Sequence, residues 1–116
     1  MENRIYKICP ISVWETAQKN GVFEGYGIDK IDGYIHFSTS SQLEETLRLH
    51  FNNIDDLVIL SVKISQLSIK WEKSRGGKLF PHLYSSLNIR NVKETFKLKK
   101  DEFGNYIIPK MILSEK

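Results

Sequence analysis

The longest almost uninterrupted apolar run of the chain, Leu57 to Val62, limits the fold more than any other feature. It is far shorter than the roughly 20 apolar residues that a membrane-spanning helix needs, so no membrane association is expected. Its first four residues are all apolar and the residues after them alternate, a pattern typical of a strand that is covered on both faces at its start. The sequence therefore predicts a central strand over residues 56–64.

Two stretches in the first half of the chain have sequence signals typical of helix ends. Ser12 is followed three residues later by a glutamate, the spacing of a capping box, and Gly21 stands where a left-handed residue would end a helix. We expect this helix over residues 12–20. Ser41 is likewise followed by a glutamate at the third position, ahead of apolar residues at helical spacing, so a second helix is expected over residues 41–51.

Apolar and polar residues alternate in further segments, which indicates strands that bury one face. The last two segments are separated by a turn near residues 101–105 and are expected to pair as a C-terminal hairpin over about 92–112. Residues 21–33 contain four glycines among apolar residues, which predicts a packed loop. Two helices near the N-terminal half and several strands predict an α+β fold with mixed or mainly antiparallel sheets. The expected strands, besides the central one, are residues 4–9, 34–38, 68–72, 92–98 and 106–112.

The 116 residues suffice for a hydrophobic core without disulfides, and no repeat or linker divides them, so 1–116 is expected to be a single domain. Cys9 is the only cysteine and cannot form an internal disulfide. The first residues lack the basic start and apolar run of a signal peptide. A cytoplasmic location is expected from these features.

The net charge of +3 is divided unevenly, with −4 in residues 1–60 and +7 in residues 61–116. A basic C-terminal half favours a small anionic ligand, although solvated lysines on exposed strands explain the same distribution. Nucleic-acid binding is disfavoured because the lysines are not interleaved with several aromatic residues. The chain also lacks a phosphate loop, a dinucleotide fingerprint and a Gly-x-Ser-x-Gly elbow, which excludes the enzyme classes that depend on them.

The first candidate site is the stretch from Asp32 to Thr46, where a short strand leads through a hydroxyl-rich turn into a helix. His36 can accept, donate or carry a proton near neutral pH. The hydroxyls of Ser38 and Thr39 could bind sugar or phosphate oxygens at the helix start. A structural histidine followed by ordinary helix-capping residues is the alternative.

The second candidate site lies between Glu72 and Tyr84. Arg75, after Ser74, can hold a phosphate or carboxylate through two parallel hydrogen bonds, and the two glycines that follow let backbone amides approach an anion. His82 and Tyr84 share one face of an extended segment and could face the same site as His36. A plain inter-strand loop over a buried His-Tyr pair is the alternative. The three histidines lack metal-ligand spacing, so no metal site is predicted.

A series of segments resembles, in identity and order, a bacterial family known as domain-of-unknown-function family 952. The resemblance spans about residues 4–90, and the C-terminal hairpin lies outside it. It is carried by Ile5-Tyr6-Lys7-Ile8, Trp14, Asp32-Gly33-Tyr34-Ile35-His36-Phe37-Ser38-Thr39, Asp56-Leu57-Val58-Ile59-Leu60, Trp71-Glu72, Ser74-Arg75-Gly76-Gly77 and Leu79-Phe80-Pro81-His82-Leu83-Tyr84.

This family is similar in fold to the ADP-ribosyltransferase-like group, whose members bind NAD in a cleft between two small sheets. The resemblance implies a polar cleft for a nucleotide-like or phosphorylated ligand of the NAD or ADP-ribose type, with transfer or hydrolysis at ribose as the reaction class. His36 would orient the ligand or donate a proton, and Arg75 would bind phosphate. The chain departs from the group at Lys7, where those enzymes have a histidine or arginine, and it lacks a Glu-x-Glu pair. A non-catalytic ligand-binding or protein-interaction module is the alternative. The expected ligand-binding residues are Ser38, Thr39, Glu72, Ser74, Arg75, His82 and Tyr84.

Overall fold

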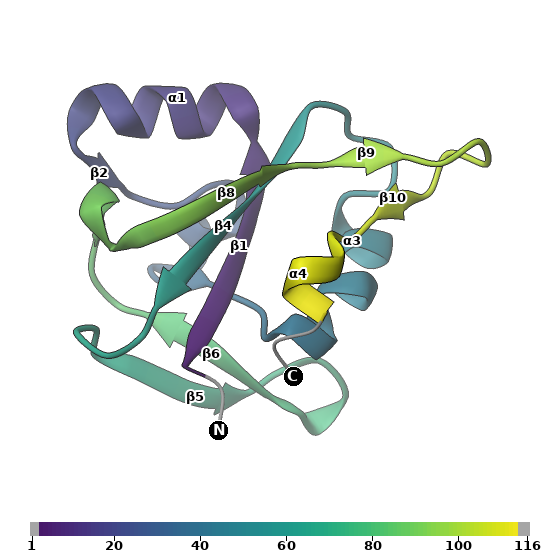
Figure 1. The fold of residues 1–116 in the computed structure, drawn as a ribbon. Coiled ribbons are helices and arrows are strands. Elements are labelled where there is room, and N and C mark those ends of the chain that lie inside the picture. Colours follow the sequence, from purple (N-terminus) through teal and green to yellow (C-terminus); the bar gives the residue numbers. More distant parts are fainter. Residues whose placement is uncertain (1–2, 114–116) are drawn as a thin grey trace.

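The fold is built on a three-stranded antiparallel sheet in which the apolar run forms the middle strand (Figure 1). A computed structural model describes residues 3–113, apart from the side chain of Arg75. Its first sheet has the order β1 (Arg4–Pro10), β4 (Leu57–Lys63), β8 (Val92–Lys97). The predicted central strand is therefore confirmed.

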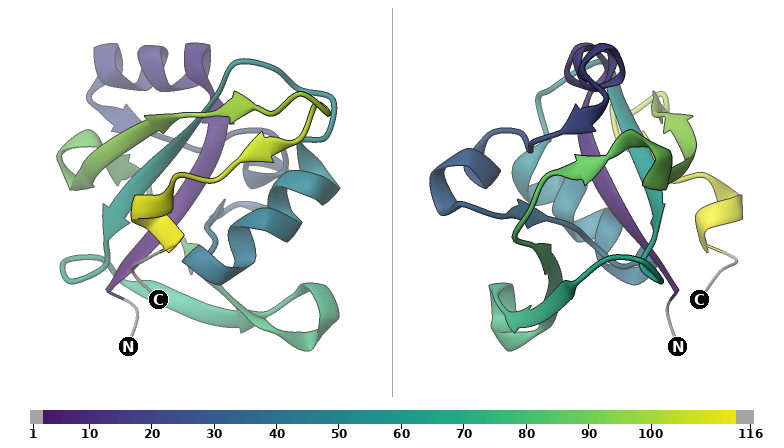
Figure 2. Two further views of the ribbon diagram at one scale, coloured as in Figure 1. Left: turned by 45° about the vertical axis from the view of Figure 1, so that its right-hand side comes forward. Right: turned by 90° about the vertical axis from the view of Figure 1, so that its left-hand side faces the viewer.

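Both faces of this sheet are covered, because alternate residues of β1 and β4 belong to different apolar clusters. Helix α1 (Ile11–Asn20) packs on one face, together with β2 (Val22–Phe23). Helix α3 (Leu43–His50) packs on the other, where the short helix α4 (Lys110–Leu113) lies beside it (Figures 1 and 2). In β4, the first face takes Val58, Leu60 and Val62, and the second takes Leu57 and Ile59.

A second three-stranded antiparallel sheet has the order β3 (Ile35–His36), β6 (Leu79–Leu83), β5 (Ile69–Lys73). It is joined to the first sheet where Tyr6 and Ser38 exchange two backbone hydrogen bonds, both 2.8 Å long. This bridge brings β1 alongside the segment that follows β3.

The fold class is confirmed: the chain is a small α+β domain with antiparallel sheets and few helices. Within residues 3–113, no helix is long and apolar enough to cross a membrane. The remaining short elements are α2 (Ile28–Asp32), η1 (Ser40–Gln42), η2 (Arg75–Gly77), β7 (Leu87–Asn88), η3 (Ile89–Asn91), β9 (Lys99–Lys100) and β10 (Tyr106–Ile107).

Both principal helices are found, but each begins differently from the prediction. Helix α1 starts at Ile11, directly after Pro10, and no side chain caps it; Ser12 lies inside the helix. Gly21 ends α1 in the left-handed conformation, at φ 82°, as predicted. The start of α3 is reached through η1, where the side chain of Gln42 accepts a hydrogen bond from the backbone N–H of Thr39, in place of the predicted Ser41 pairing.

The predicted pairing of residues 92–98 with residues 106–112 is wrong. Strand β8 pairs with β4, and the C-terminal hairpin is confined to β9 and β10 around the expected turn at residues 101–105. The alternation of apolar and polar residues in β8 indicates that one face of this strand is buried, but it does not identify the strand that pairs with it.

Candidate functional site

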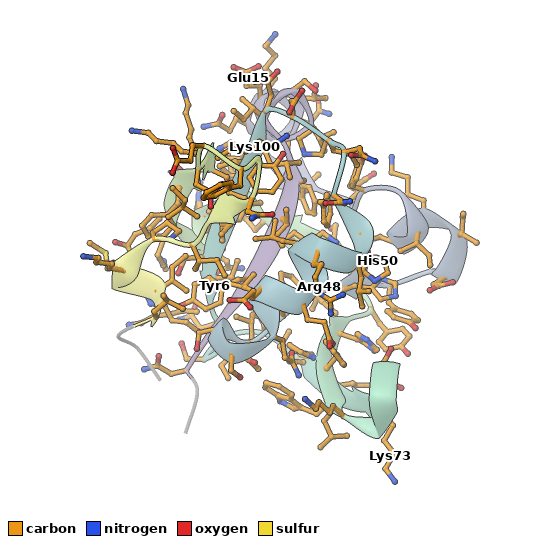
Figure 3. The ribbon with its side chains drawn as sticks, turned by 90° about the vertical axis from the view of Figure 1, so that its right-hand side faces the viewer. Tyr6, Glu15, Arg48, His50, Lys73 and Lys100 are labelled. Atoms are coloured by element: carbon orange, nitrogen blue, oxygen red, sulfur yellow. The ribbon has the colours of Figure 1, made fainter. Side chains whose placement is uncertain are left out.

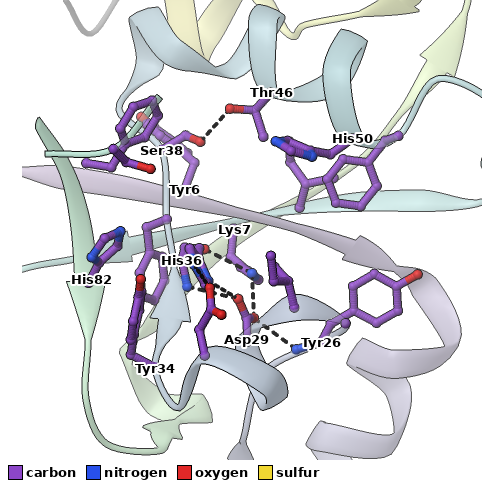
Figure 4. A pocket seen from close by; sticks show the side chains of 18 of the residues that line it. Tyr6, Lys7, Tyr26, Asp29, Tyr34, His36, Ser38, Thr46, His50 and His82 are labelled. Carbon is purple, nitrogen blue, oxygen red and sulfur yellow. Dashed lines mark hydrogen bonds and ion pairs between the residues drawn. The ribbon is translucent and has the colours of Figure 1, made fainter. Parts of the chain in front are cut away.

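A cavity of about 430 Å³ lies where β1, α2, β3, α3 and β6 meet (Figure 4). Its volume falls in the range of small-molecule sites, and aromatic and apolar side chains form much of its wall. The polar side chains that line it include Lys7, Asp29, Asp32, His36, Ser38 and His82.

The most buried part of the site is an ion pair between Lys7 and Asp29, whose side chains are 8% and 1% exposed. Lys7 Nζ lies 2.6 Å from Asp29 Oδ2 and also donates to the carbonyl oxygen of His36 at 2.9 Å. The other carboxylate oxygen, Asp29 Oδ1, accepts from the His36 backbone N–H at 3.0 Å and lies 2.6 Å from His36 Nδ1. Asp29 therefore ties β1, α2 and β3 together through one side chain.

The glycine-rich segment before α2 allows Asp29 to reach this position. Gly25 has φ 101°, and a Cβ atom there would lie 2.7 Å from the Cβ of Asp29. The following residue, Tyr26, donates its backbone N–H to Asp29 Oδ2 at 2.9 Å. The close approach explains why a glycine stands at position 25.

The two members of the buried pair change each other's ionisation. Burial lowers the pKa of Lys7 below its ordinary value of 10.5, and the charge and hydrogen bond of Asp29 offset only part of that effect. Burial raises the pKa of Asp29, but hydrogen bonds from His36 and Lys7 and the charge of Lys7 outweigh it, so this pKa lies below 3.8. Asp29 is therefore a carboxylate at neutral pH.

His36 has a carboxylate at each ring nitrogen. Besides Asp29 at Nδ1, Asp32 Oδ2 lies 3.0 Å from Nε2. The Asp32 side chain is 33% exposed, in contrast to the buried Asp29. The ring is therefore fixed on its buried side and held less tightly on its exposed side.

A second histidine has a different set of partners. His82 Nδ1 lies 2.7 Å from Glu72 Oε1, which also accepts from the Tyr84 hydroxyl at 2.7 Å. These hydrogen bonds, first that of Tyr84 and then that of His82, lower the pKa of Glu72 and keep it a carboxylate. The same hydrogen bond to Glu72 raises the pKa of Tyr84 to about 12. His82 Nε2 is buried and has no hydrogen-bond partner among the described residues.

Tyr34 holds the two histidines in one aromatic cluster. Its ring centroid lies 4.5 Å from that of His36, 4.4 Å from that of His82 and 4.8 Å from that of Tyr84. His36 and His82 are direct partners in the β3–β6 ladder, and their ring centroids are 5.2 Å apart. The expected proximity of the two histidines is therefore found.

The structure brings together some of the residues predicted for the site. His36, Ser38, Ser74 and His82 line the cavity. Glu72 and Tyr84 support His82 from outside it, and Tyr84 lines a neighbouring, shallower depression together with Tyr34. Thr39 takes part in the cap before α3. Ser38 Oγ shares a hydrogen bond with Thr46 Oγ1 at 3.0 Å. The side chain of Arg75 lies outside the described part of the chain.

Sequence reasoning missed Asp29, gave no role to Asp32 and Tyr34 although both stand in the first candidate stretch, and noted Lys7 without a role inside the protein. A lysine between the buried residues Tyr6 and Ile8 was the available signal, because a lysine in an apolar strand needs a partner. Among residues 3–113, no group of three or more His, Cys, Asp or Glu side chains is arranged to hold a metal ion. Cys9 is buried, and burial raises its pKa to about 12, so its thiol is not an activated nucleophile.

Fold and site together define a small α+β domain with a histidine- and carboxylate-lined cavity between antiparallel sheets. Residues 8–95 match the family described as protein of unknown function (DUF952), and the chain belongs to this family. It is similar to the crystal structure of protein CC0527 from Caulobacter crescentus, with 38% identity, a TM-score of 0.89 and coverage of 95% of this chain and 98% of that chain. The solution NMR structure of CC0527 is 40% identical, with a TM-score of 0.80 and coverage of 90% and 91%. No curated protein matches the sequence.

Proposed function

We propose that the cavity binds a nucleotide-like ligand of the NAD or ADP-ribose type, and that the chain acts as a transferase or hydrolase at the ribose of this ligand. The proposal includes an ADP-ribosyltransferase-like fold and a cytoplasmic location, where the single thiol of Cys9 stays reduced. His82 and Ser38 would contact the sugar, and Arg75 would contact phosphate.

The observation that carries the proposal is the pairing of His82 with Glu72. A carboxylate can only accept hydrogen bonds, so Nδ1 of His82 is the donor to Glu72, and in the neutral ring Nε2 is an acceptor. A buried acceptor without a partner costs free energy, and a ligand hydroxyl would remove that cost. Ribose supplies such hydroxyls.

The side of the molecule next to the cavity carries basic residues that would suit the phosphate part of the ligand. Figure 3 shows Arg48 and His50 of α3 and Lys73 of β5 on one side of the molecule. His50 lines the cavity, and Lys73 precedes Ser74, which also lines it. Arg48 lies 3.8 Å from Glu45, so the attraction for a phosphate at this edge rests on Lys73 in the proposal.

Lys7 is a residue at which the chain departs from ADP-ribosyltransferases. It stands on the first strand, where the resemblance places a ribose-holding histidine or arginine, and it lines the cavity. Its ammonium group already contacts Asp29 and the carbonyl of His36. Lys7 therefore acts in the proposal by holding His36 in place, and ligand binding falls to the histidines.

A titration of the ¹⁵N-labelled chain with NAD, ADP-ribose and inorganic phosphate tests the proposal. NAD or ADP-ribose should shift the amide signals of His36, Ser74 and His82. His82→Phe keeps a ring against Tyr34 but removes both nitrogens, and we expect it to weaken binding about tenfold or more. Glu102→Gln, in the exposed turn before β10, should leave affinity unchanged.

If none of the three ligands moves signals near His36 and His82, the proposal is wrong. Signals that move with phosphate alone would reduce the site to an anion site. Binding of NAD or ADP-ribose without any turnover would identify a non-catalytic ligand-binding module.

A further inference from the structure

The two histidines of the cavity differ in what contacts Nε2: Asp32 lies 3.0 Å from Nε2 of His36, whereas Nε2 of His82 has no hydrogen-bond partner among the described residues. We infer that His82 is the general base and His36 the general acid in the cleavage of a riboside. The leaving nitrogen of this riboside carries no positive charge before cleavage, so it needs a proton as it departs, as a purine base does. The inference rests on the proposed function and narrows its substrate to one kind of glycosidic bond.

His82 has the geometry of a base. Glu72 Oε1 lies 2.7 Å from Nδ1 and fixes a proton there, so in the neutral ring the lone pair is at Nε2. Tyr84 donates to the same carboxylate oxygen and holds it in position. No described residue donates to Nε2. The ring is thus oriented by one carboxylate and free to take a proton at the opposite nitrogen, the arrangement that activates a hydroxyl or a water molecule.

His36 has the geometry of an acid. Asp29 Oδ1 lies 2.6 Å from Nδ1, and Asp32 Oδ2 lies 3.0 Å from Nε2. Both neighbours are carboxylates that only accept, so each contact requires a proton on the ring nitrogen, and the ring fits as an imidazolium. Asp29 is buried and held by Lys7, whereas the Asp32 side chain is 33% exposed. The Nε2 proton is therefore the one that a leaving group can take, by replacing Asp32 as the acceptor.

Tyr34 packs against both rings and lines the same cavity. His82 Nε2 is buried, so contact between this nitrogen and a substrate requires a movement of side chains in the cavity wall. The titratable groups that face His36 are Lys7, Asp29, Asp32, Tyr34 and His82, and those that face His82 are Glu72, Tyr34, Tyr84 and His36.

The two histidines account for both proton transfers of one hydrolytic step. The oxygen of a water molecule, or of an acceptor hydroxyl, forms a bond to C1′ of the ribose while its proton passes to His82 Nε2. The bond from C1′ to the leaving nitrogen breaks, its electron pair stays on that nitrogen, and the proton of His36 Nε2 neutralises it. The carboxylates beside His36 favour the positive charge that develops on the sugar ring.

An acid is useful for only one class of leaving group. When nicotinamide leaves NAD, the electron pair returns to a positively charged ring nitrogen, and nicotinamide departs neutral without a proton. When a purine leaves ribose, the nitrogen becomes an anion unless a proton is delivered to it. A site with an imidazolium held between two carboxylates therefore suits a purine riboside, including the adenosine half of NAD or ADP-ribose.

Chromatography of the bases released from NAD tests this directly, because NAD contains both kinds of bond. We expect adenine to be released from NAD, and also from AMP and adenosine. Release of nicotinamide in place of adenine would overturn the inference. Binding of these compounds without release of either base would also overturn it but would leave the proposed function standing, whereas absence of binding would remove both.

The roles of the two histidines are distinguished with a second substrate, 4-nitrophenyl β-D-ribofuranoside. Its leaving group departs as the nitrophenolate anion and therefore needs no general acid. His36→Gln should lower adenine release about 100-fold or more but nitrophenolate release less than tenfold. His82→Gln should lower both by about 100-fold or more. Glu102→Gln is the control and should behave like the unaltered chain. Equal losses on both substrates in His36→Gln would show that His36 is not the acid.

Discussion

Lys7 is the residue on which the arrangement of the site depends. A lysine in the middle of a buried strand loses its hydration, and only a nearby carboxylate compensates for that loss. Asp29 provides the compensation from α2 and uses its second oxygen to fix His36. One buried ion pair therefore does two things: it neutralises the lysine and positions the catalytic candidate.

Replacing Asp29 by asparagine should destabilise the chain strongly. Asp29→Asn leaves the ammonium of Lys7 buried without an opposite charge, and loss of one partner of a buried pair costs about 3–5 kcal/mol. Urea unfolding at pH 7 measures this cost. The double variant Lys7→Met with Asp29→Asn removes the uncompensated charge and should recover more than half of the lost free energy.

The Arg4–Glu94 pair is the matched control for this prediction. Its side chains are 22% and 38% exposed, so water already screens it. Glu94→Gln should therefore lower the free energy of unfolding by about 1 kcal/mol or less. A similar loss in Asp29→Asn and Glu94→Gln would mean that burial of the Lys7–Asp29 pair has no energetic consequence.

At the level of elements, α2 and the segment before it determine where the carboxylates lie. Gly25→Ala should destabilise the chain more than Gly33→Ala, although both glycines have positive φ, 101° and 84°. An alanine at position 33 meets no atom within 4 Å and costs only the backbone strain, about 1–2 kcal/mol. An alanine at position 25 adds a clash with the Cβ of Asp29 at 2.7 Å.

Thermal or urea unfolding of the two variants measures the difference, and the NMR signals of His36 report where the clash acts. Gly25→Ala should move these signals because Asp29 holds the ring, whereas Gly33→Ala should move them less. If the two variants lose the same free energy, the close approach at Gly25 is not what requires a glycine.

The elements differ in how far the sequence could predict them. The central strand and helix α3 follow from apolar patterning, which acts over a few residues. The proximity of His36 to His82 was instead a hypothesis that two candidate stretches far apart in the sequence share one site. Helix α2 spans only residues 28–32 between glycines, too short a stretch for helical periodicity to be visible, so it was interpreted as a loop. Asp29 was missed with it, because the partner of Lys7 is set by tertiary contact and leaves no local pattern. Asp32 was included in the candidate stretch but was given no role.

At the level of the whole molecule, the uneven charge distribution matches the organisation of the site. The acidic first half supplies Asp29 and Asp32 to the interior of the cavity, and the basic second half supplies Lys73 beside it. The two sheets meet at the Tyr6–Ser38 bridge, so the site forms only when distant parts of the chain have assembled. Ionisation of the site and stability of the fold should therefore change together with pH.

The stability of the chain should fall in acid partly because of Asp29. Its pKa lies below the ordinary value of 3.8 in the folded state, so the unfolded chain takes up the proton first as the pH decreases. The stabilisation from Asp29 is then complete above pH 3.8 and is lost as the pH falls through the lower pKa of the folded state. Glu72 contributes in the same direction below 4.5, but it is partly exposed and its contribution is screened.

Urea unfolding at several pH values, from about 5 down to about 3, of the unaltered chain and of Asp29→Asn isolates this effect. The stability difference between them should be largest at the upper end of the range and shrink as the pH falls, because protonation of Asp29 removes the same charge as the substitution does. Glu102→Gln, which alters an exposed carboxylate, should give a small and nearly constant difference. A difference between Asp29→Asn and the unaltered chain that does not change with pH would mean that the Asp29 carboxylate does not stabilise the fold through its charge.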